Sequence, residues 1–184
     1  MSRNLGSLQC LTMETIICEK IQRITKNRER LEKELNVKIE NSGKEVKIQG
    51  NPEDEYIAEK VIWALEFGFP FSVALLIKEQ DLMFEVLSIK DYTRRKDLEK
   101  VRARIIGKKG GTLKTLLELT KCYFEIKGNQ VGIIGEPEYI RNAQEAMVSL
   151  IRGAKHANIY AFLEKHQVKP VFDLGLKEIK KKKK

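Results

Sequence analysis

The 184-residue sequence predicts an α+β fold in which the order β-α-α-β-β-α occurs twice in tandem, each copy forming a three-stranded sheet packed on helices. Three observations predict this fold. The sequence repeats at a constant offset, short strand-like runs alternate with amphipathic helical runs, and the length suits two domains of about 80 to 90 residues. The repeat period therefore corresponds to the size of a domain and not to the unit of a solenoid.

The repeat is clearest between the segments EVKIQGNPE and QVGIIGEPE, in which five residues recur at an offset of 85, beginning with Val46 and Val131. Apolar pairs at the same offset extend the match from Leu31 to Leu65. One gap-free offset over some forty residues indicates two copies of one fold.

The elements of the second copy follow from its periodicity. In order, we expect a strand over residues 82–89, a helix through Leu98, Val101 and Ile105, a helix over residues 113–120, a strand over residues 122–126, a Gly128-Asn129 turn, a strand over residues 131–134, and a helix that starts at Pro137.

The first copy follows the same plan. We expect a strand over residues 11–17, a short helix, a longer helix ending near Leu35, two strands around a Ser42-Gly43 turn, and a helix over residues 53–66. The apolar segment 67–79 predicts a helix after Pro70 that packs between the copies. The expected boundaries are 1–70 for the first domain, 71–81 for the connector helix, 82–167 for the second domain and 168–184 for a basic tail.

The net charge of +9 is unevenly distributed. Residues 1–92 contain 13 Lys/Arg against 16 Asp/Glu, whereas residues 93–184 contain 22 against 10. The second half carries a net charge of +12, and +7 without the five lysines that end the chain. A polyanionic partner is therefore expected at the second half, because clustered Lys and Arg displace counterions from phosphates.

Several classes of protein are disfavoured. The longest apolar stretch, residues 67–77, is too short to span a bilayer, which needs about 20 residues, and the N-terminus lacks a signal-peptide pattern. We therefore expect a soluble cytoplasmic protein. Cys10, Cys18 and Cys122 form no CxxC pair and are expected to be reduced thiols. No metal site, cofactor or catalytic residue is expected.

The central motif is RIIGKKGGT at residues 104–112, which contains a GxxG sequence between two predicted helices. A bare GxxG is a weak signal, but here an Ile-Ile pair precedes it and a strand hairpin and a helix follow. That is the KH arrangement, whose GxxG loop clamps the backbone of four nucleotides of single-stranded RNA. The predicted RNA-binding residues are Gly107, Lys108, Lys109, Gly110, Gly111, Arg102, Arg104, Ile105, Ile106 and Lys114.

Each residue type suits this chemistry. Glycine lets phosphates approach the main chain closely, and the start of the next helix points unpaired N–H groups and its dipole at the same phosphates. Residues 94–114 contain nine Lys/Arg and two acids, and Lys108 and Lys109 add charge within the loop itself. Ile105, Ile106 and one side of the strand over residues 122–126 are expected to form the groove for bases, although both isoleucines could equally belong to the core.

The first copy lacks this loop. At an offset of 85, Gly107 and Gly110 correspond to Gln22 and Thr25, and no glycine occurs between Gly6 and Gly43. We therefore expect a degenerate domain that serves packing or protein contact.

The segments VRARIIGKKGGT, VGIIGEPE and GAKHANIYAFLE resemble the archaeal KH-domain rRNA-processing proteins, homologues of the eukaryotic ribosome assembly factor called partner of Nob-one, or Dim-two. The resemblance implies two tandem type I KH domains, of which the second keeps its GxxG. It also implies binding to the 3′ region of small-subunit rRNA during maturation, beside the Nob-one endonuclease, and contact with the alpha subunit of initiation factor two. Gly111 departs from the expected pattern, which favours a polar residue there.

Three other readings stay open at this point. An enzyme is disfavoured because no paired carboxylates or P-loop occur at useful spacing. An adaptor could bind a protein partner, such as the alpha subunit of initiation factor two, through the acidic first domain and the apolar connector. Another KH-type RNA-binding regulator, such as a KH module of transcription or of an RNA-degrading complex, would usually add an S1-type barrel, for which this chain has no room.

Overall fold

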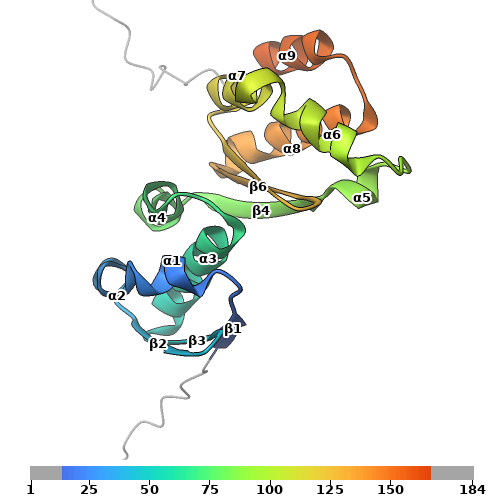
Figure 1. Cartoon of the computed structure of the whole chain (residues 1–184). Helices are drawn as coiled ribbons and strands as arrows, with labels where there is room; N and C mark the ends of the chain where they lie inside the picture. The colour runs from blue at the N-terminus through green and yellow to red at the C-terminus, as the bar shows by residue number, and fades with distance from the viewer. Residues whose placement is uncertain (1–13, 167–184) are drawn as a thin grey trace, which may run out of the picture.

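The computed structural model describes residues 14–166 and has two halves of similar order (Figure 1). The first half comprises β1 (Glu14–Ile17), α1 (Ile21–Thr25), α2 (Arg28–Leu35), β2 (Lys38–Ser42), β3 (Glu45–Gln49) and α3 (Pro52–Phe67). After the connecting helix α4 (Phe71–Glu79), the second half comprises β4 (Met83–Ser88), α5 (Ile89–Tyr92), α6 (Leu98–Ile106), the 3-10 turn η1 (Lys108–Gly110), α7 (Gly111–Thr120), β5 (Tyr123–Lys127), β6 (Gln130–Gly135), α8 (Pro137–Arg152) and α9 (His156–Lys165).

Each half contains one three-stranded antiparallel sheet, ordered β1-β3-β2 and β4-β6-β5. The registers correspond, since Ile16 faces Val46 in the first sheet and Leu87 faces Val131 in the second. The predicted α+β class with two such sheets is confirmed. The Gly128-Asn129 turn is also confirmed, whereas the first hairpin turns at Gly43 and Lys44, because Ser42 already pairs with Glu45.

The offset of 85 relates β2 to β5, β3 to β6 and α3 to α8 residue by residue. It does not extend to the first strands. Cys18 N donates to Lys44 O and Ile89 N donates to Asn129 O, each at 2.8 Å, so these two buried residues are equivalent at an offset of 71. The second half therefore has fourteen more residues between its first strand and its second long helix. The alignment of the GxxG glycines with Gln22 and Thr25 was wrong, because both lie inside α1.

Two helices were not predicted. The short α5 follows β4 directly, and α9 packs on α7 and α8 after Gly153. The expected residues 11–13 of the first strand, Cys10 and the basic tail lie outside the described residues.

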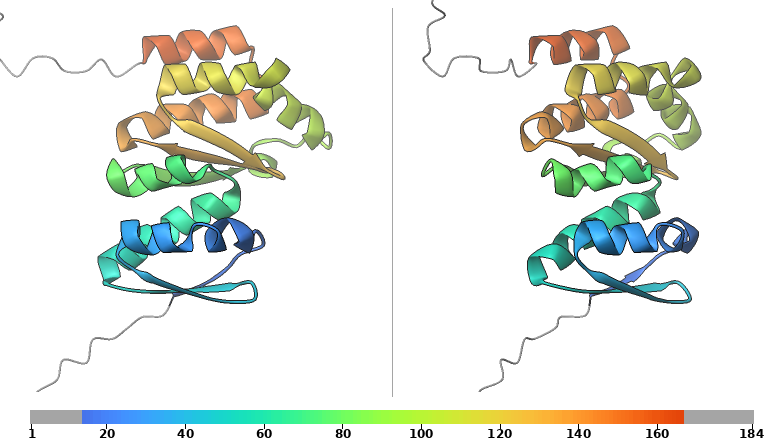
Figure 2. Two further views of the ribbon diagram at one scale, coloured as in Figure 1. Left: turned by 60° about the vertical axis from the view of Figure 1, so that its left-hand side comes forward. Right: turned by 90° about the vertical axis from the view of Figure 1, so that its left-hand side faces the viewer.

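Helices cover both faces of the second sheet but only one face of the first (Figure 2). The helices α7 and α8 contact one side of the second sheet, and α3 and α4 contact the other. In the first sheet, β2 buries only Ile39, whereas β6 buries five of its six residues. The prediction that an apolar helix after Pro70 packs between the halves is confirmed by α4, whose Ala74, Leu75 and Ile77 are buried.

An aromatic cluster joins the halves. The rings of Phe67, Phe69 and Phe84 lie with centroids 5.9 to 6.1 Å apart. A Cβ atom added at Gly132, in the central strand β6, would lie 2.8 Å from the rings of both Phe67 and Phe69. Glycine is therefore required there by the close approach of the two rings.

A buried carboxylate adds a polar link beside this cluster. Lys127 Nζ, at the end of β5, donates to Glu66 Oε1 at 2.7 Å, and Lys20 N donates to Glu66 Oε2 at 2.9 Å. Burial alone would raise the pKa of Glu66, but these hydrogen bonds and the Lys127 charge hold its pKa below the ordinary value. The side chain of Arg23 also donates to Gly68 O at 2.6 Å. These contacts tie β5 and α1 to the end of α3.

Cys18 and Cys122 are free and buried, as predicted for reduced thiols, and burial raises the pKa of each to about 11. Among the helices of residues 14–166, none combines the length and apolarity that a membrane crossing needs.

Candidate nucleic-acid interface

The predicted GxxG loop lies between α6 and α7 and protrudes from the core of the second half. Val101 and Ile105 anchor α6, since both are buried, and Leu116 anchors α7. The four residues between these helices, 107–110, form the loop and its 3-10 turn. Lys108 and Lys109 are exposed, whereas Gly107 and Gly110 are partly exposed.

The two loop glycines are required for different reasons. Gly107 has φ +71°, and a Cβ atom there would lie 2.2 Å from Thr112 Oγ1 and 2.8 Å from Thr112 N. Gly110 has φ +75° but open space around the position of its Cβ. Gly107 is therefore needed for packing against α7, and Gly110 for its left-handed backbone, with room left for a ligand to approach. Lys109 is also left-handed, with φ +53°.

Gly111 differs from both, because its φ of −58° and ψ of −39° are helical. A Cβ atom there would meet nothing within 4 Å. The backbone does not require glycine at this position, but its absence of a side chain leaves the start of α7 uncovered.

The start of α7 is suited to an anion. No side chain caps this ten-residue helix, its first turn contains no acid, and Gly110 precedes it. Unpaired N–H groups and the positive end of the helix dipole therefore face the loop. Lys114 is exposed one turn further along α7.

The two predicted arginines are half-buried, and both donate hydrogen bonds to main-chain carbonyl oxygens. Arg102 Nη1 donates to Gly128 O at 3.1 Å, which ties α6 to the β5–β6 turn. Arg104 Nη2 donates to Gly153 O at 3.2 Å and to Ala154 O, at the α8–α9 connection. Both guanidinium groups thus hold the loop's supporting helix in place.

The Ile-Ile pair divides between core and surface. Ile105 is fully buried, so it cannot wall a groove, whereas Ile106 is 38% exposed.

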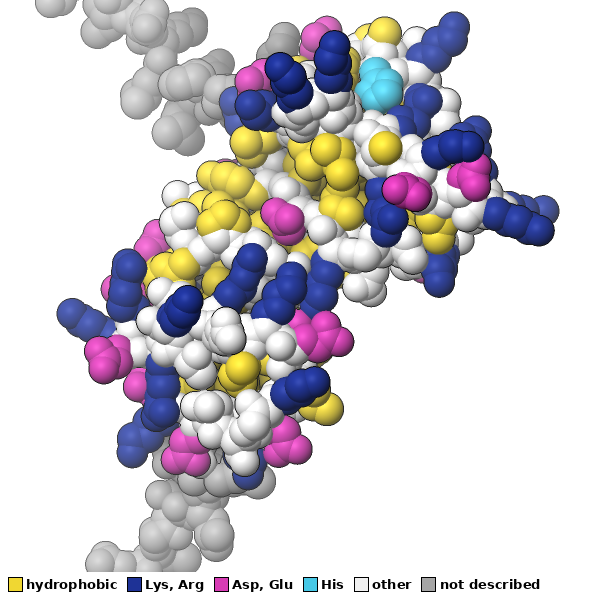
Figure 3. Space-filling model, in the orientation of Figure 1, with side chains coloured by type: hydrophobic (Ala, Val, Ile, Leu, Met, Phe, Trp, Pro, Cys, Tyr) yellow, Lys and Arg dark blue, Asp and Glu magenta, His cyan; other side chains and the backbone are white. Residues whose placement is uncertain are grey.

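A groove runs along α7 below the loop. Figure 3 shows hydrophobic side chains gathered where α7 faces α4. The groove has a cavity volume of about 220 Å³ and is lined from three elements, by Leu113, Lys114 and Leu117 of α7, by Tyr123, Phe124 and Glu125 of β5, and by Phe69, Pro70 and Val73 of the connector. The predicted strand wall is present in β5, whose five residues are all half-buried.

The sequence predicted the helix over residues 113–120 but did not assign Leu113 or Leu117 to a groove. Leu117 is 36% exposed, so it faces the groove. The apolar stripe of this helix is wider than core packing requires, because Leu116 is followed directly by Leu117. That extra width is the sequence feature that could have indicated an exposed leucine. No local signal pointed to Pro70 and Val73, which lie some fifty residues away in sequence.

The first half has no comparable loop. Only Lys26 and Asn27 separate α1 from α2. Arg28 Nε lies 3.1 Å from Glu32 Oε1, and Arg30 stacks over the Phe71 ring at 4.7 Å. Several of its cations are therefore engaged within the protein.

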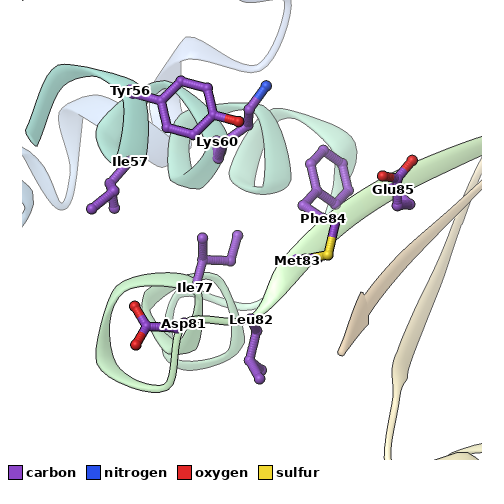
Figure 4. A pocket seen from close by; sticks show the side chains of 9 residues that line it. All are labelled: Tyr56, Ile57, Lys60, Ile77, Asp81, Leu82, Met83, Phe84 and Glu85. Atoms are coloured by element: carbon purple, nitrogen blue, oxygen red, sulfur yellow. The ribbon is translucent and has the colours of Figure 1, made fainter. Parts of the chain in front are cut away.

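A second cavity of about 280 Å³ lies between α3, α4 and the start of β4 (Figure 4). Lys60 stacks over the Tyr56 ring at 5.0 Å there, but Asp81 and Glu85 also line it. Two carboxylates against one lysine make it a poor phosphate site. Within residues 14–166, no group of three or more His, Cys, Asp or Glu side chains could hold a metal ion.

Comparison with known proteins agrees with a KH-type loop in the second half. Residues 83–168 match the family model of the second KH domain of PNO1, described as a eukaryotic-type KH domain (KH-domain type I). The KH domain-containing protein MJ0443 of Methanocaldococcus jannaschii is 34% identical over an alignment of 146 residues, which covers 76% of this chain and 64% of the relative. The chain thus spans less than two thirds of the length of this curated relative.

Solved structures agree over more of the chain. Dim2p from Pyrococcus horikoshii OT3 is 26% identical with a TM-score of 0.77, covering 83% of this chain and 98% of that one. Dim2p of the same organism in a complex with a/eIF2alpha and rRNA has a TM-score of 0.79 at 26% identity, covering 87% and 96%. A protein of unknown function from Aeropyrum pernix, at 22% identity and a TM-score of 0.78 over 84% and 90%, supports the fold alone.

Proposed function

We propose that the chain binds single-stranded RNA through the segment over residues 83–168, which matches the PNO1-type KH family model as the sequence resemblance predicted. The observation that carries the proposal is the loop at the start of α7. Gly110 is open to approach, the helix start is uncapped, and Lys108 and Lys109 are exposed beside it. Such a loop suits the backbone of about four nucleotides.

Each predicted residue has a place in this proposal. Lys108, Lys109 and Lys114 contact phosphates, and Gly110 and Gly111 keep the main chain accessible. Gly107 lets the loop pack closely against Thr112, and Ile106 presents an exposed apolar side chain just before the loop. Arg102 and Arg104 act as positioning residues, because their guanidinium groups hold α6 against the β5–β6 turn and the α8–α9 connection. Ile105 supports the loop from the core.

The proposed target is the 3′ region of small-subunit rRNA, and the proposed role is to assist its maturation without a catalytic step or cofactor. The structural likeness to a Dim2p that was solved with a/eIF2alpha and rRNA supports this choice. A Nob-one endonuclease acting beside the protein would supply the cleavage.

The first half is, in this proposal, a second KH fold that has lost its clamp, so that the chain holds two tandem type I domains. The equal strand order and register of the two sheets support it. The domain boundaries at residues 1–70, 71–81, 82–167 and 168–184 remain part of the proposal.

The test replaces Lys108 and Lys109 with Asp in the full chain. Both are exposed loop residues, so the melting temperature should change little while two negative charges face the phosphates. Affinity for a labelled single-stranded oligonucleotide from the 3′ end of small-subunit rRNA should fall at least about tenfold by fluorescence anisotropy. The wild-type log K should fall with log salt at a slope of about −2 to −3, from roughly −0.7 per phosphate.

A matched control makes the same charge change in the first half, with Lys26→Asp and Lys33→Asp. Both lysines are exposed, whereas Arg23 is engaged with Gly68 and would confound the control. The control should lose far less affinity. Equal losses in the two variants, or unaltered binding by the loop variant, would remove the second domain from the proposed role.

A second candidate function is favoured by one surface. Tyr56 and Met83 line the cavity of Figure 4 and are 61% and 41% exposed, and Trp63, two turns along α3 from Tyr56, is 42% exposed. Exposed aromatic side chains of this kind mark protein interfaces. We therefore also propose that this surface binds a protein partner, for which the alpha subunit of initiation factor two is the first choice.

Calorimetry with that subunit, without RNA, would test the second candidate. Tyr56→Ala with Trp63→Ala should weaken binding more than tenfold, while the Lys108→Asp and Lys109→Asp variant should bind as the wild type does. Retained binding by the aromatic variant would exclude this surface.

A further inference from the structure

The groove below the GxxG loop has one wall that the second half does not itself provide. Leu113 and Leu117 of α7 form one side, and Pro70 and Val73 form the other. The last two come from the connector, which leaves α3 and enters α4 against the second sheet. We propose that the connector closes the RNA groove into a pocket for one base, and that Glu125 makes this pocket selective for guanine. The inference rests on the proposed RNA-binding function.

The shape and polarity of the pocket suit a flat base. Its walls are mostly aliphatic, the edge strand β5 lies between them with Tyr123 and Phe124, and its volume is about 220 Å³. Unstacked bases of single-stranded RNA bind between apolar or aromatic side chains and present their Watson–Crick edges to polar groups. Lys114 also lines the pocket and is four residues after Gly110. Its cation would therefore lie close to the loop and could contact the phosphate of the nucleotide whose base enters the pocket.

Glu125 is the acidic residue that lines the pocket. It lies on β5 opposite Gly132, and Gly68 leaves room for it, because a Cβ atom at Gly68 would lie 3.2 Å from Glu125 Cγ. Within residues 14–166, no side-chain hydrogen bond or ion pair engages the Glu125 carboxylate. An unengaged carboxylate in a phosphate-binding surface costs affinity unless it accepts hydrogen bonds from the ligand.

The chemistry of a carboxylate favours guanine. An ionised carboxylate only accepts hydrogen bonds. The Watson–Crick edge of guanine presents two adjacent donors, N1–H and N2–H₂, which match its two oxygens. Adenine and cytosine each place an acceptor beside their donor, and uracil places its single donor between two carbonyl oxygens. Each of these three bases would therefore bring an oxygen or nitrogen lone pair against the carboxylate.

In the first half, side chains of α2 fill the region that is equivalent to this groove. At an offset of 85, Leu113 and Leu117 correspond to Arg28 and Glu32. Glu32 Oε1 accepts a hydrogen bond from Ile39 N of β2 at 2.9 Å and from Arg28 Nε at 3.1 Å. The side chains of the first half thus occupy the edge that the second half leaves open.

The test measures binding of synthetic heptauridylate RNAs in which a single guanosine is moved through each position. The wild type should bind one of these RNAs at least tenfold more tightly than heptauridylate, since a good paired contact is worth about 1–3 kcal/mol of discrimination. Glu125→Gln should reduce that preference to less than threefold. The matched control Glu118→Gln removes the same charge from an exposed site on α7 outside the groove, and it should retain the preference.

A second pair of variants tests the connector. Val73→Gln places a longer polar side chain in the pocket, whereas Ser72→Gln makes the same change on the exposed side of α4. The former should abolish the guanosine preference and the latter should keep it, with melting temperatures measured for both.

The outcomes separate the two proposals. Loss of all binding in the Lys108→Asp and Lys109→Asp variant, together with a guanosine preference that Glu125→Gln leaves intact, would overturn this inference and leave the RNA-binding role standing. A preference for another base, or none at any position, would also overturn it. Binding that ignores the loop lysines would instead defeat the proposed function.

Discussion

The two halves have the same strand order and strand register, and their helices correspond, α2 with α7 and α3 with α8. The groove beside the second strand, however, is open in the second half and filled by side chains in the first. In the second half Leu117 and Phe124 both line a cavity. In the first, the residues at the same positions are Glu32 and Ile39, and the carboxylate accepts a hydrogen bond from the strand's N–H. Glutamate or leucine at this one helix position therefore decides whether the N–H group at the strand edge is hydrogen-bonded within the protein or left accessible to a ligand.

The two sheets also differ on one face, which lies opposite α2 and α3 in the first half and opposite α7 and α8 in the second. Gly132, in the central strand of the second sheet, lies beneath Phe67 and Phe69, whereas the equivalent residue of the first sheet is the half-buried Lys47. Within residues 14–166 no helix covers this face of the first sheet, whereas the second sheet uses it as the junction between the halves (Figure 2). A shared fold thus assigns opposite roles to equivalent surfaces through a few side chains.

The largest effect is expected from giving the second sheet the residue of the first. Gly132→Lys would place a side chain 2.8 Å from two aromatic rings and bury a charge between the halves. We expect a loss of more than about 4 kcal/mol in the free energy of unfolding, measured by urea denaturation. The reciprocal Lys47→Gly should cost only about 1 kcal/mol, through strand entropy. Similar losses from both variants would show that the two faces do not differ as described.

A smaller effect is expected within the loop that only the second half has. Gly107→Ala would force a Cβ atom against Thr112 at a positive φ, and we expect a loss of about 3 kcal/mol in thermal or urea unfolding. Gly111→Ala is the control, because that position is helical and open. The control should leave the stability unchanged or raise it by up to about 1 kcal/mol.

The smallest effect is expected from removing the charge that fills the groove of the first half. The hydrogen bond from Ile39 N and the neighbouring Arg28 hold the pKa of Glu32 below its ordinary value. The stabilisation is therefore present above the pKa of the unfolded state, about 4.3, and is lost as the pH falls through the lower pKa of the folded state.

Glu32→Gln should lose about 1 kcal/mol of stability at neutral pH, and the difference from the wild type should shrink as the pH falls below about 4. Urea unfolding at several pH values measures it. A difference that grows in acid would contradict the role assigned to Glu32.

Much of this fold followed from periodicity. Val101 and Ile105 marked α6, Gly128 and Asn129 marked the hairpin, and Pro137 marked the start of α8, because each signal is local. The glycines of the loop were also recognised from the sequence, although the need for Gly107 arises from its contact with Thr112.

What the sequence did not predict depends on contacts between distant segments. Nothing near Arg104 indicates that its guanidinium reaches Gly153, forty-nine residues away. In the same way, Pro70 and Val73 read as a connector alone, and only the packing of α4 against the second sheet brings them to the groove. The fourteen-residue difference between the halves was hidden because the offset of 85 is constant only from α2 onward.

Gly132 also makes the order of the two repeats irreversible. Exchanging the halves along the chain would place Lys47 where the aromatic rings of the linking segment must land. It would also leave Tyr123 and Ile134 on a face without a cover. The order of the two halves is therefore fixed by one glycine in the central strand of the second sheet and by the phenylalanine that ends α3.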